Sequence, residues 1–373
     1  MSTPTTTSPN PVLALLRGFY PYVIAVLIAF VLYKVMPTGA SDQFQFIGIQ
    51  INSFMTKVIA AIGVAIIMAV SLNIVNGYTG QFSLGHAGFM AVGAYTSAWI
   101  TYYGSIHFFG SPAVIEGLFT KGSALFLASI FAGGCVAALF GYLVGLPSLR
   151  LRGDYLAIVT LGFGEILRAV LNQSQPVLDA DEISESTARE IITGVGGALG
   201  FSGVPKYSNL FWVWSIAIST VIVCYRLKQS IHGRAFLSIR ENEIAAEAMG
   251  VPTTRYKNAA FAIAAFFAGI GGGLFAHTLG NVVSPTEMNF QRSIDFVIMV
   301  VLGGMGSISG SIIAAIALTI LPEALRGFAE YRMIVYPLLL IVFMIVRPDG
   351  IFGIREFWEI RILRRKRAEA PST

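Results

Sequence analysis

The chain carries little charge for its length. Of its 373 residues, 12% are Asp, Glu, Lys or Arg and 55% are hydrophobic. Soluble globular domains are charged at roughly 25% of their positions. Half that amount cannot keep so apolar a chain in solution, so the composition excludes an ordinary soluble protein and predicts an all-α, polytopic membrane protein. The net charge of +5 would suggest nucleic acid in a soluble protein, but here the basic residues lie next to apolar spans and set the membrane topology instead.

Cysteines and common catalytic motifs are also scarce. The two cysteines, Cys135 and Cys224, lie inside apolar runs, so we expect buried thiols and neither a disulfide nor a metal site. The sequence has no Gly-x-x-x-x-Gly-Lys-Ser/Thr loop, which excludes the usual cradle for ATP phosphates. It also has no His-Glu-x-x-His or Gly-x-Ser-x-Gly motif. We therefore predict a protein without a catalytic centre, metal or cofactor, whose energy comes from another molecule.

Long apolar runs are what the chain does have. A helix needs about 20 residues to cross about 30 Å of hydrocarbon. The predicted membrane helices are residues 20–36, 54–76, 85–103, 123–146, 155–171, 210–227, 258–279, 293–302, 307–321 and 333–346. The eighth and ninth are too short to cross upright on their own. No small-residue cleavage site follows the first run, so we expect a retained span and no removed signal peptide.

The distribution of Lys and Arg predicts the orientation of these helices. Positive charges collect in cytoplasmic loops. They are concentrated at residues 150–152, in the loop 228–256 and in the tail 351–373, whereas the insert 172–209 holds five acidic residues against two basic ones and fits the outside. These sides agree only if the eighth and ninth runs cross separately, giving ten crossings. We thus expect a disordered cytoplasmic N-terminus (1–18), one transmembrane domain (19–350) and a basic cytoplasmic tail.

Two glycine-rich stretches interrupt the apolar runs. Residues 303–310 contain four glycines, and each would cost a continuous helix about 1 kcal/mol relative to alanine. We therefore expect a tight hairpin or a broken helix. Freed backbone groups inside a membrane must be satisfied by protein or by a watery cavity, so we place this hairpin beside a translocation pathway.

The second stretch, residues 71–86, mixes polar side chains with glycines between two apolar helices. It is either a re-entrant turn that lines the pathway or a polar cytoplasmic turn that joins two helices. For His86 alone, a capping or packing role is favoured over ligand binding. The candidate pathway residues from both stretches are Asn73, Asn76, Gln81, Ser83, His86, Gly303, Gly304, Gly306 and Ser307.

One long, densely charged run, residues 226–257, lies between two strongly apolar runs. On a helix, Arg240, Glu243 and Glu247 fall along one side, and apolar residues cover most of the other. Gly250 and Pro252 should end this helix, because glycine tolerates the left-handed cap and proline cannot continue the ladder. The pattern predicts a helix of about three turns. It is either a handle for another protein on the water side or an ordinary solvated loop helix.

Residues 233–250 resemble the cytoplasmic coupling loop of ABC importer permeases, in the form found in branched-chain amino acid permeases. The general loop has a Glu-Ala-Ala triplet that is separated from a following glycine by three residues. Ala245, Ala246 and Gly250 fit this pattern, whereas Ile244 holds the Glu position and Glu243 lies one residue early. The resemblance implies that two partner ATPases contact a coupling loop whose candidate residues are Arg234, Arg240, Glu241, Glu243, Ala245, Ala246, Glu247 and Gly250.

Residues 71–95, 149–166 and 301–307 are similar to the same family, and the four stretches follow its order from about residue 55 to 350. The coupling loop and the acidic insert resemble the larger, M-type subunit. This implies an architecture similar to that of the vitamin B12 importer, in a bacterial inner membrane with surrounding lipid. The implied partners are an H-type permease, two ATP-binding subunits and a periplasmic binding protein. The implied cargo is leucine, isoleucine, valine or related small amides and acids.

A different class of function stays open, namely an ion-coupled or proton-coupled carrier, or a channel, that works alone. It needs ionisable groups near the membrane midplane, and Glu165 is the one candidate. Because Glu165 and Arg168 are spaced i, i+3, we expect a structural pair, and Arg292 and Asp295 allow the same interpretation. The glycines at 269 and 271–273 are expected to permit close helix packing.

Overall fold

The computed structural model describes residues 53–110, 121–148, 154–178, 187–278 and 282–328, with isolated positions and short pieces between 27 and 51 and between 337 and 356. The predicted N-terminus 1–18 lies outside these residues. So do most of the first and tenth predicted spans, of the basic tail and of the acidic part of the insert 172–209. The account below concerns the described residues.

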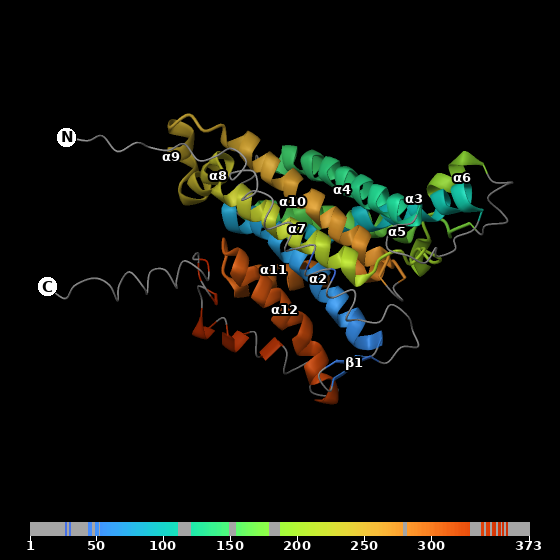
Figure 1. The fold of residues 1–373 in the computed structure, drawn as a ribbon. Coiled ribbons are helices and arrows are strands. Elements are labelled where there is room, and N and C mark those ends of the chain that lie inside the picture. The colour runs from blue at the N-terminus through green and yellow to red at the C-terminus, as the bar shows by residue number, and fades with distance from the viewer. Residues whose placement is uncertain are drawn as a thin grey trace, which may run out of the picture.

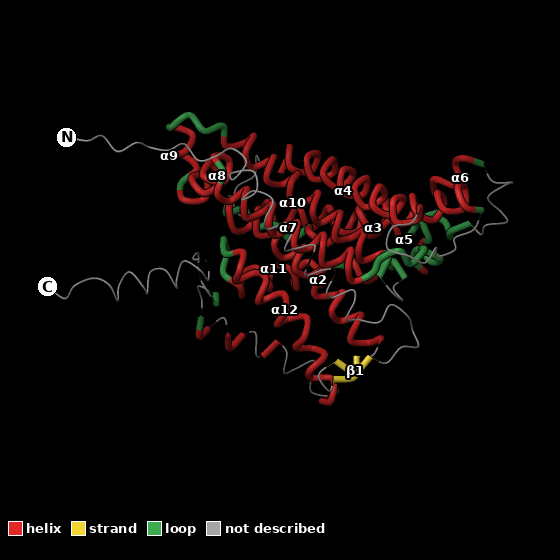
Figure 2. The backbone as a smooth tube through the Cα atoms, in the orientation of Figure 1, coloured by secondary structure: helices red, strands yellow, loops and turns green. Residues whose placement is uncertain are grey.

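Helices form at each predicted span within these residues. They are α2 (Ser53–Asn73), α3 (His86–Phe109), α4 (Lys121–Ser148), α5 (Asp154–Asn172), α7 (Leu210–Gln229), α10 (Thr253–Ala276), α11 (Phe290–Gly303) and α12 (Ile308–Ala324). Short segments join them: α6 (Ala188–Thr193), α8 (Ile231–Glu241), α9 (Glu243–Ala248), the π-helix η1 (Ile74–Tyr78) and the 3-10 turns η2 (Gly197–Leu199), η3 (Pro285–Met288) and η4 (Leu325–Phe328). Figure 2 shows how little of the described chain is not helical.

The expected all-α class is confirmed, with one small addition. A two-stranded antiparallel hairpin precedes α2, formed by β1 (Phe44–Phe46) and β2 (Ile49–Ile51), with Phe44 opposite Ile51. The sequence analysis did not predict it. Five described helices are long and apolar enough to cross a membrane: Phe54–Tyr78, Lys121–Pro147, Tyr155–Asn172, Leu210–Gln229 and Thr253–Ala276. The chain is therefore a polytopic membrane protein, and the count of ten crossings stays a prediction.

The central helix of the bundle is α2. It packs against α7, α10, α11 and α12, and its middle residues, among them Ile67, Met68 and Leu72, are completely buried. In contrast, α4 and α5 turn apolar side chains such as Phe131 and Ile158 outward. A helix buried on all sides and helices with exposed apolar faces are the two kinds expected in a membrane bundle. Cys224 is buried as expected, but Cys135 is exposed on the outward face of α4, so the expectation for Cys135 was wrong.

Glycines allow α3, α4 and α10 to pack closely. A Cβ atom on Gly93 of α3 would overlap the backbone of Gly269 of α10, and one on Gly269 would lie 2.8 Å from the backbone oxygen of Gly133 of α4. These helices therefore approach backbone to backbone, as small residues permit in membrane bundles. The packing role expected for the glycines of α10 is confirmed.

The eighth and ninth predicted runs form two helices with a tight hairpin between them, as expected. α11 has 14 residues and α12 has 17, so they extend about 21 Å and about 25 Å at 1.5 Å per residue. Gly304 and Gly306 have φ angles of +103° and +95°, which glycine adopts without strain. In Figure 1 this hairpin and the α8–α9 pair lie at the same end of the bundle, with α6 at the opposite end.

The close approach of α3 and α10 leads to a test. Gly93→Ala places a methyl group against the immobile backbone of Gly269 and should destabilise the bundle by about 1–3 kcal/mol, the usual cost of overpacking. Thermal unfolding of the purified protein in detergent should show a lower midpoint. Gly162→Ala is the matched control, because a Cβ atom there meets no atom within 4 Å. Equal midpoints for the two variants would contradict the packing analysis.

Candidate functional site

The charged loop folds as two short helices at one end of the bundle, α8 and α9, where we predicted one helix of about three turns. That prediction was wrong at Asn242. Its backbone is extended, with φ −160°, and its side-chain Oδ1 accepts a hydrogen bond from the Ala245 amide at 3.0 Å. This N-cap satisfies an amide of α9 and so begins a new helix. Gly250, with φ +85°, ends α9 as expected, and α10 begins after Pro252.

The second of these helices is almost entirely exposed. In α9 only Ala246 is buried, and the side chains of Ile244 and, just beyond the helix, Met249 are 71% and 84% exposed. Arg234, Glu241, Ala245, Glu247 and Gly250 are also exposed. α9 is fixed to α10, because Lys257 of α10 forms an ion pair with Glu243 of α9. The pair gives Glu243 a structural partner inside the chain.

Arg240 joins the charged loop to both predicted helix breaks. Its Nη1 donates hydrogen bonds to the carbonyl oxygens of Gly77, at 2.7 Å, and of Met305, at 3.2 Å. Gly77 lies in η1, where α2 loses its regular hydrogen bonding, and Met305 lies in the α11–α12 hairpin. A single guanidinium therefore bonds to backbone groups that both helix interruptions leave free.

Asn73 links the two breaks directly. Its Oδ1 accepts a hydrogen bond from the Gly306 amide at 2.8 Å, and its Nδ2 donates to the Ser307 carbonyl at 3.1 Å. Asn73 is completely buried, so this paired amide satisfies groups that water cannot reach. Gly77 must be glycine here, because a Cβ atom would overlap the Asn73 carboxamide.

A buried ion pair completes the same junction. The Lys228 Nζ, at the end of α7, donates to the Gly306 carbonyl at 2.7 Å and to Glu356 at 2.6 Å. The Glu356 carboxylate accepts hydrogen bonds from the amides of Ile308 and Ser309, both at 3.0 Å, and therefore caps α12 with negative charge. Burial alone would raise the pKa of Glu356, but these hydrogen bonds outweigh it and hold the pKa below its usual value. The stabilisation is therefore present at neutral pH and is lost as pH falls through that lowered pKa.

The remaining candidate pathway residues are buried around this junction. The Ser83 amide donates to Asn76 Oδ1 at 3.2 Å, and His86 shares a hydrogen bond of 2.9 Å with Ser71. Gln81 is 8% exposed, and its Oε1 accepts a longer bond of 3.4 Å from Thr79. Gly303 lies against Gly310 inside the hairpin. All nine predicted pathway residues are thus buried at or next to the two helix breaks, and Arg240 bonds both breaks to the loop.

Several residues of the junction were not predicted. Lys228 and Glu356 were assigned only to the charge of the loop and the tail, and Ser71 was not singled out. Their partners lie far away in the sequence, so no local spacing of residues could predict these contacts. Among the charged pairs, Glu165 and Arg168 do form the expected ion pair at 2.7 Å, and Glu165 also accepts a bond from the Phe290 amide. Arg292 and Asp295 form no salt bridge of the kind seen for Glu165 and Arg168, although the two charges interact electrostatically.

The fold and the junction define a class. A helical membrane bundle with an exposed, charged helix pair bonded to broken membrane helices is a multi-pass transport component. Within the described residues no three His, Cys, Asp or Glu side chains are grouped to hold a metal ion. Comparison with known proteins identifies the family. Residues 54–345 match the family described as branched-chain amino acid transport system / permease component. The chain belongs to this family, whose members are non-catalytic components of transporters.

Individual relatives agree with this assignment. The chain is 39% identical over 307 residues to the high-affinity branched-chain amino acid transport system permease protein LivM of Salmonella typhimurium, which covers 77% of this chain and 67% of that protein. It is 25% identical over 296 residues to the LivH permease protein of the same organism, covering 77% and 90%. The guanosine ABC transporter permease protein NupQ of Bacillus subtilis is 25% identical over 209 residues, covering 54% and 60%.

The junction predicts a local effect of Arg240. In Arg240→Gln the carbonyls of Gly77 and Met305 lose a charged donor, so the hairpin 303–307 should open more often. Hydrogen–deuterium exchange of peptides that cover this hairpin should accelerate about tenfold or more. Arg234→Gln removes an exposed arginine of the same helix that makes no side-chain bond to a described residue, and exchange there should not change. Unchanged exchange in Arg240→Gln would show that Arg240 does not hold the hairpin.

Proposed function

We propose that this chain is the M-type permease subunit of an ATP-driven importer for leucine, isoleucine, valine or related small amides and acids in a bacterial inner membrane. The permease assignment follows from the family. The cargo is supported by the relatives, whose names specify branched-chain amino acids. The observation that carries the coupling mechanism is the bond between Arg240 of α8 and the two helix breaks.

The proposed partners occupy opposite ends of the bundle. Two ATP-binding subunits contact α8 and α9, and an H-type permease completes the pore. This assignment places the α8–α9 end and both termini in the cytoplasm. A periplasmic binding protein then docks at the other end, near α6 and the insert 172–209 (Figure 1). ATP is bound by the partners, because this chain has no loop for its phosphates.

The exposed surface of α9 is suited to a partner. Ile244 and Met249 lie on the water-facing end of a membrane protein, where an exposed large apolar side chain is favourable once another protein covers it. Glu243 and Lys257 join α9 to α10, so a force on α9 acts on a membrane helix. Arg240 and Asn73 then connect the loop to α2 and to the α11–α12 hairpin.

Transport would follow from two packings of this junction with similar free energy. Closure of the ATPase pair biases one packing by moving α8 and α9, and the movement changes the positions of α2, α11 and α12. These helices extend from the junction to the opposite end of the bundle, so a small shift at the loop can alter access there (Figure 1). The nine predicted pathway residues are therefore proposed to gate the pathway at its cytoplasmic end.

A carrier that works alone is the second candidate, and it needs a free ionisable group within the membrane. Glu165 was its candidate residue. The Glu165 carboxylate instead accepts hydrogen bonds from Arg168 and from the Phe290 amide, so it is used in joining α5 to α11. These bonds remove Glu165 as a free coupling group, and the importer is favoured by the family assignment.

The proposed docking surface predicts a selective loss of partners. Ile244→Asp combined with Met249→Asp places charge on the two exposed apolar side chains of the loop and should abolish copurification of the ATP-binding subunits. Both side chains are solvent-facing, so the thermal unfolding midpoint should not change. Leu199→Asp is the control, because Leu199 is 86% exposed but lies in η2 at the opposite end. Full copurification with the double variant would contradict the docking assignment.

The transport function itself is tested by reconstitution. The chain with its H-type, ATP-binding and binding-protein partners in lipid vesicles should accumulate labelled isoleucine only when ATP and the binding protein are both present. Labelled guanosine and urea serve as competing cargo. Accumulation by the purified chain alone, driven by a proton gradient without ATPases, would refute the importer and establish the independent carrier.

A further inference from the structure

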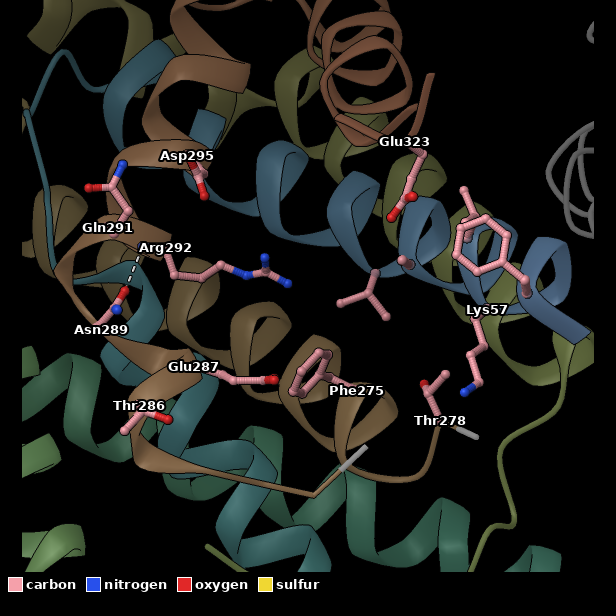
Figure 3. A pocket seen from close by; sticks show the side chains of 14 residues that line it. Lys57, Phe275, Thr278, Thr286, Glu287, Asn289, Gln291, Arg292, Asp295 and Glu323 are labelled. Atoms are coloured by element: carbon pink, nitrogen blue, oxygen red, sulfur yellow. Dashed lines mark hydrogen bonds between the residues drawn. The ribbon is translucent and has the colours of Figure 1, made fainter. Parts of the chain in front are cut away.

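A cavity of about 540 Å³ opens at the end of the bundle opposite to the α8–α9 loop. Its walls come from the first turns of α2, the end of α10, the segment η3 with the start of α11, and the end of α12 (Figure 3). Pockets of roughly 300–1,000 Å³ are the size that binds small molecules. The cavity belongs to neither the junction nor the docking surface of α9.

The cavity gathers charged groups of both signs, of which Arg292 and Asp295 are near enough to interact electrostatically. Lys57 and Arg292 supply positive charge, and Glu287, Asp295 and Glu323 supply negative charge. None of these five side chains forms an ion pair or a hydrogen bond with a described residue. Unpaired charges are costly in a membrane protein unless water or a ligand satisfies them. Lys57 and Glu287 are exposed to water, so the cost falls on the partly buried Arg292, Asp295 and Glu323, and their convergence on one cavity indicates a site that a ligand can complete.

Arg292 is positioned for such a ligand. Asn289 caps α11 by accepting a hydrogen bond from the Arg292 amide at 3.0 Å, which fixes the first turn. The guanidinium lies 6.0 Å from the ring centre of Phe275 and 5.8 Å from that of Phe296. These rings orient the side chain without neutralising it, and Figure 3 shows it extending into the cavity. All of its side-chain donors are therefore available to a carboxylate.

The other wall of the cavity is apolar. Val58, Ala61 and Val64 of α2 face it together with Phe275 of α10. An unbranched polar solute would leave this wall without a partner, whereas an aliphatic side chain would bury its surface there. The cavity walls thus offer a guanidinium that can bind an anion, carboxylates that can bind a cation, and an aliphatic surface.

We propose that this cavity is a binding site for a zwitterionic, aliphatic amino acid, with Arg292 binding the α-carboxylate and Asp295 and Glu323 attracting the α-ammonium group. The inference rests on the proposed function and adds to it a substrate site within the permease itself. The four elements of the cavity wall are also the elements that meet the junction or the loop at their other ends. Lys57 and Asn73 are 16 positions apart on α2, about 24 Å along the helix, so one helix contacts both sites.

The test uses cysteine protection in the assembled transporter without the binding protein. Ala61→Cys, in a Cys135→Ser background, should react with a charged methanethiosulfonate reagent, because Ala61 lines the cavity and is exposed. Saturating leucine should slow this reaction several-fold. Leucine methyl ester, which lacks the carboxylate, and 4-methylpentanoate, which lacks the ammonium group, should not. Ile192→Cys, on exposed α6 outside the cavity, should react equally with and without leucine.

The role of Arg292 has its own measurement. In Arg292→Gln the leucine concentration needed for half protection should rise about tenfold or more, because a charged hydrogen-bond donor to the carboxylate is lost. Arg189→Gln, an exposed arginine outside the cavity, should leave it unchanged. The unfolding midpoint of both variants confirms that the bundle is intact.

Several results would overturn the site. They are the absence of protection by leucine, equal protection in Arg292→Gln, and equal protection by either analogue. Protection by the unliganded binding protein but not by leucine would assign the cavity to protein docking and also refute it. ATP-driven uptake of leucine is measured in parallel on the same transporter after the binding protein has been added. Uptake without protection leaves the importer and removes this site, whereas protection without uptake retains the site and refutes the importer.

Discussion

A break in a membrane helix leaves backbone amides and carbonyls that lipid cannot satisfy, and this constraint governs the α8–α9 end of the bundle. α2 and the α11–α12 hairpin both break there. The protein satisfies the freed groups with its own side chains: Arg240 and Lys228 donate to carbonyls, and Asn73 both donates and accepts. Because these donors come from the charged loop, from the end of α7 and from α2, the breaks cannot exist in this form without the loop. The contact between the loop and the membrane helices is thus required to satisfy the free backbone groups, whatever movement it also transmits.

The same constraint explains why the residues of the junction are charged or amides and why small residues surround them. A charged donor bonded to a carbonyl contributes more than a neutral one, and its loss leaves a buried acceptor unpaired. Gly77 is needed because the Asn73 carboxamide occupies the space of a side chain. Glu356 balances the charge of Lys228 and also caps α12, so one carboxylate satisfies both a cation and a helix terminus. Most of this network is satisfied within the chain, and Asn76 Nδ2 is the exception among its described side chains, buried without a hydrogen-bond partner.

The sequence predicted the helices and both breaks well, because apolar runs and glycine clusters are local signals. It predicted none of the bonds between them. Arg240 lies 163 positions from Gly77, and Asn73 lies 234 positions from Ser307, so no periodicity connects them. Asn242 was a local signal that could have been used, since asparagine is a strong N-cap, but the amphipathic pattern across it hid the break. For Arg292 and Asp295, spacing alone suggested a pair, whereas the rings of Phe275 and Phe296 orient the guanidinium into the cavity.

The two polar regions of the bundle differ in a way that separates their roles. In the junction most donors and acceptors have a partner within the chain, with Asn76 Nδ2 as an exception, whereas the five charged side chains of the cavity form no ion pair or hydrogen bond with a described residue. A satisfied network gains nothing from a solute, since binding would have to break existing bonds. Charged groups that have no such bonds can bind a solute without breaking any, so the full free energy of the new contacts favours binding. Because α2, α11 and α12 connect the two regions, the proposed site would give a solute a lever on helices whose other ends are bonded to the loop. Reciprocity of linkage then requires that movement of the loop alter the affinity of the cavity by the same factor.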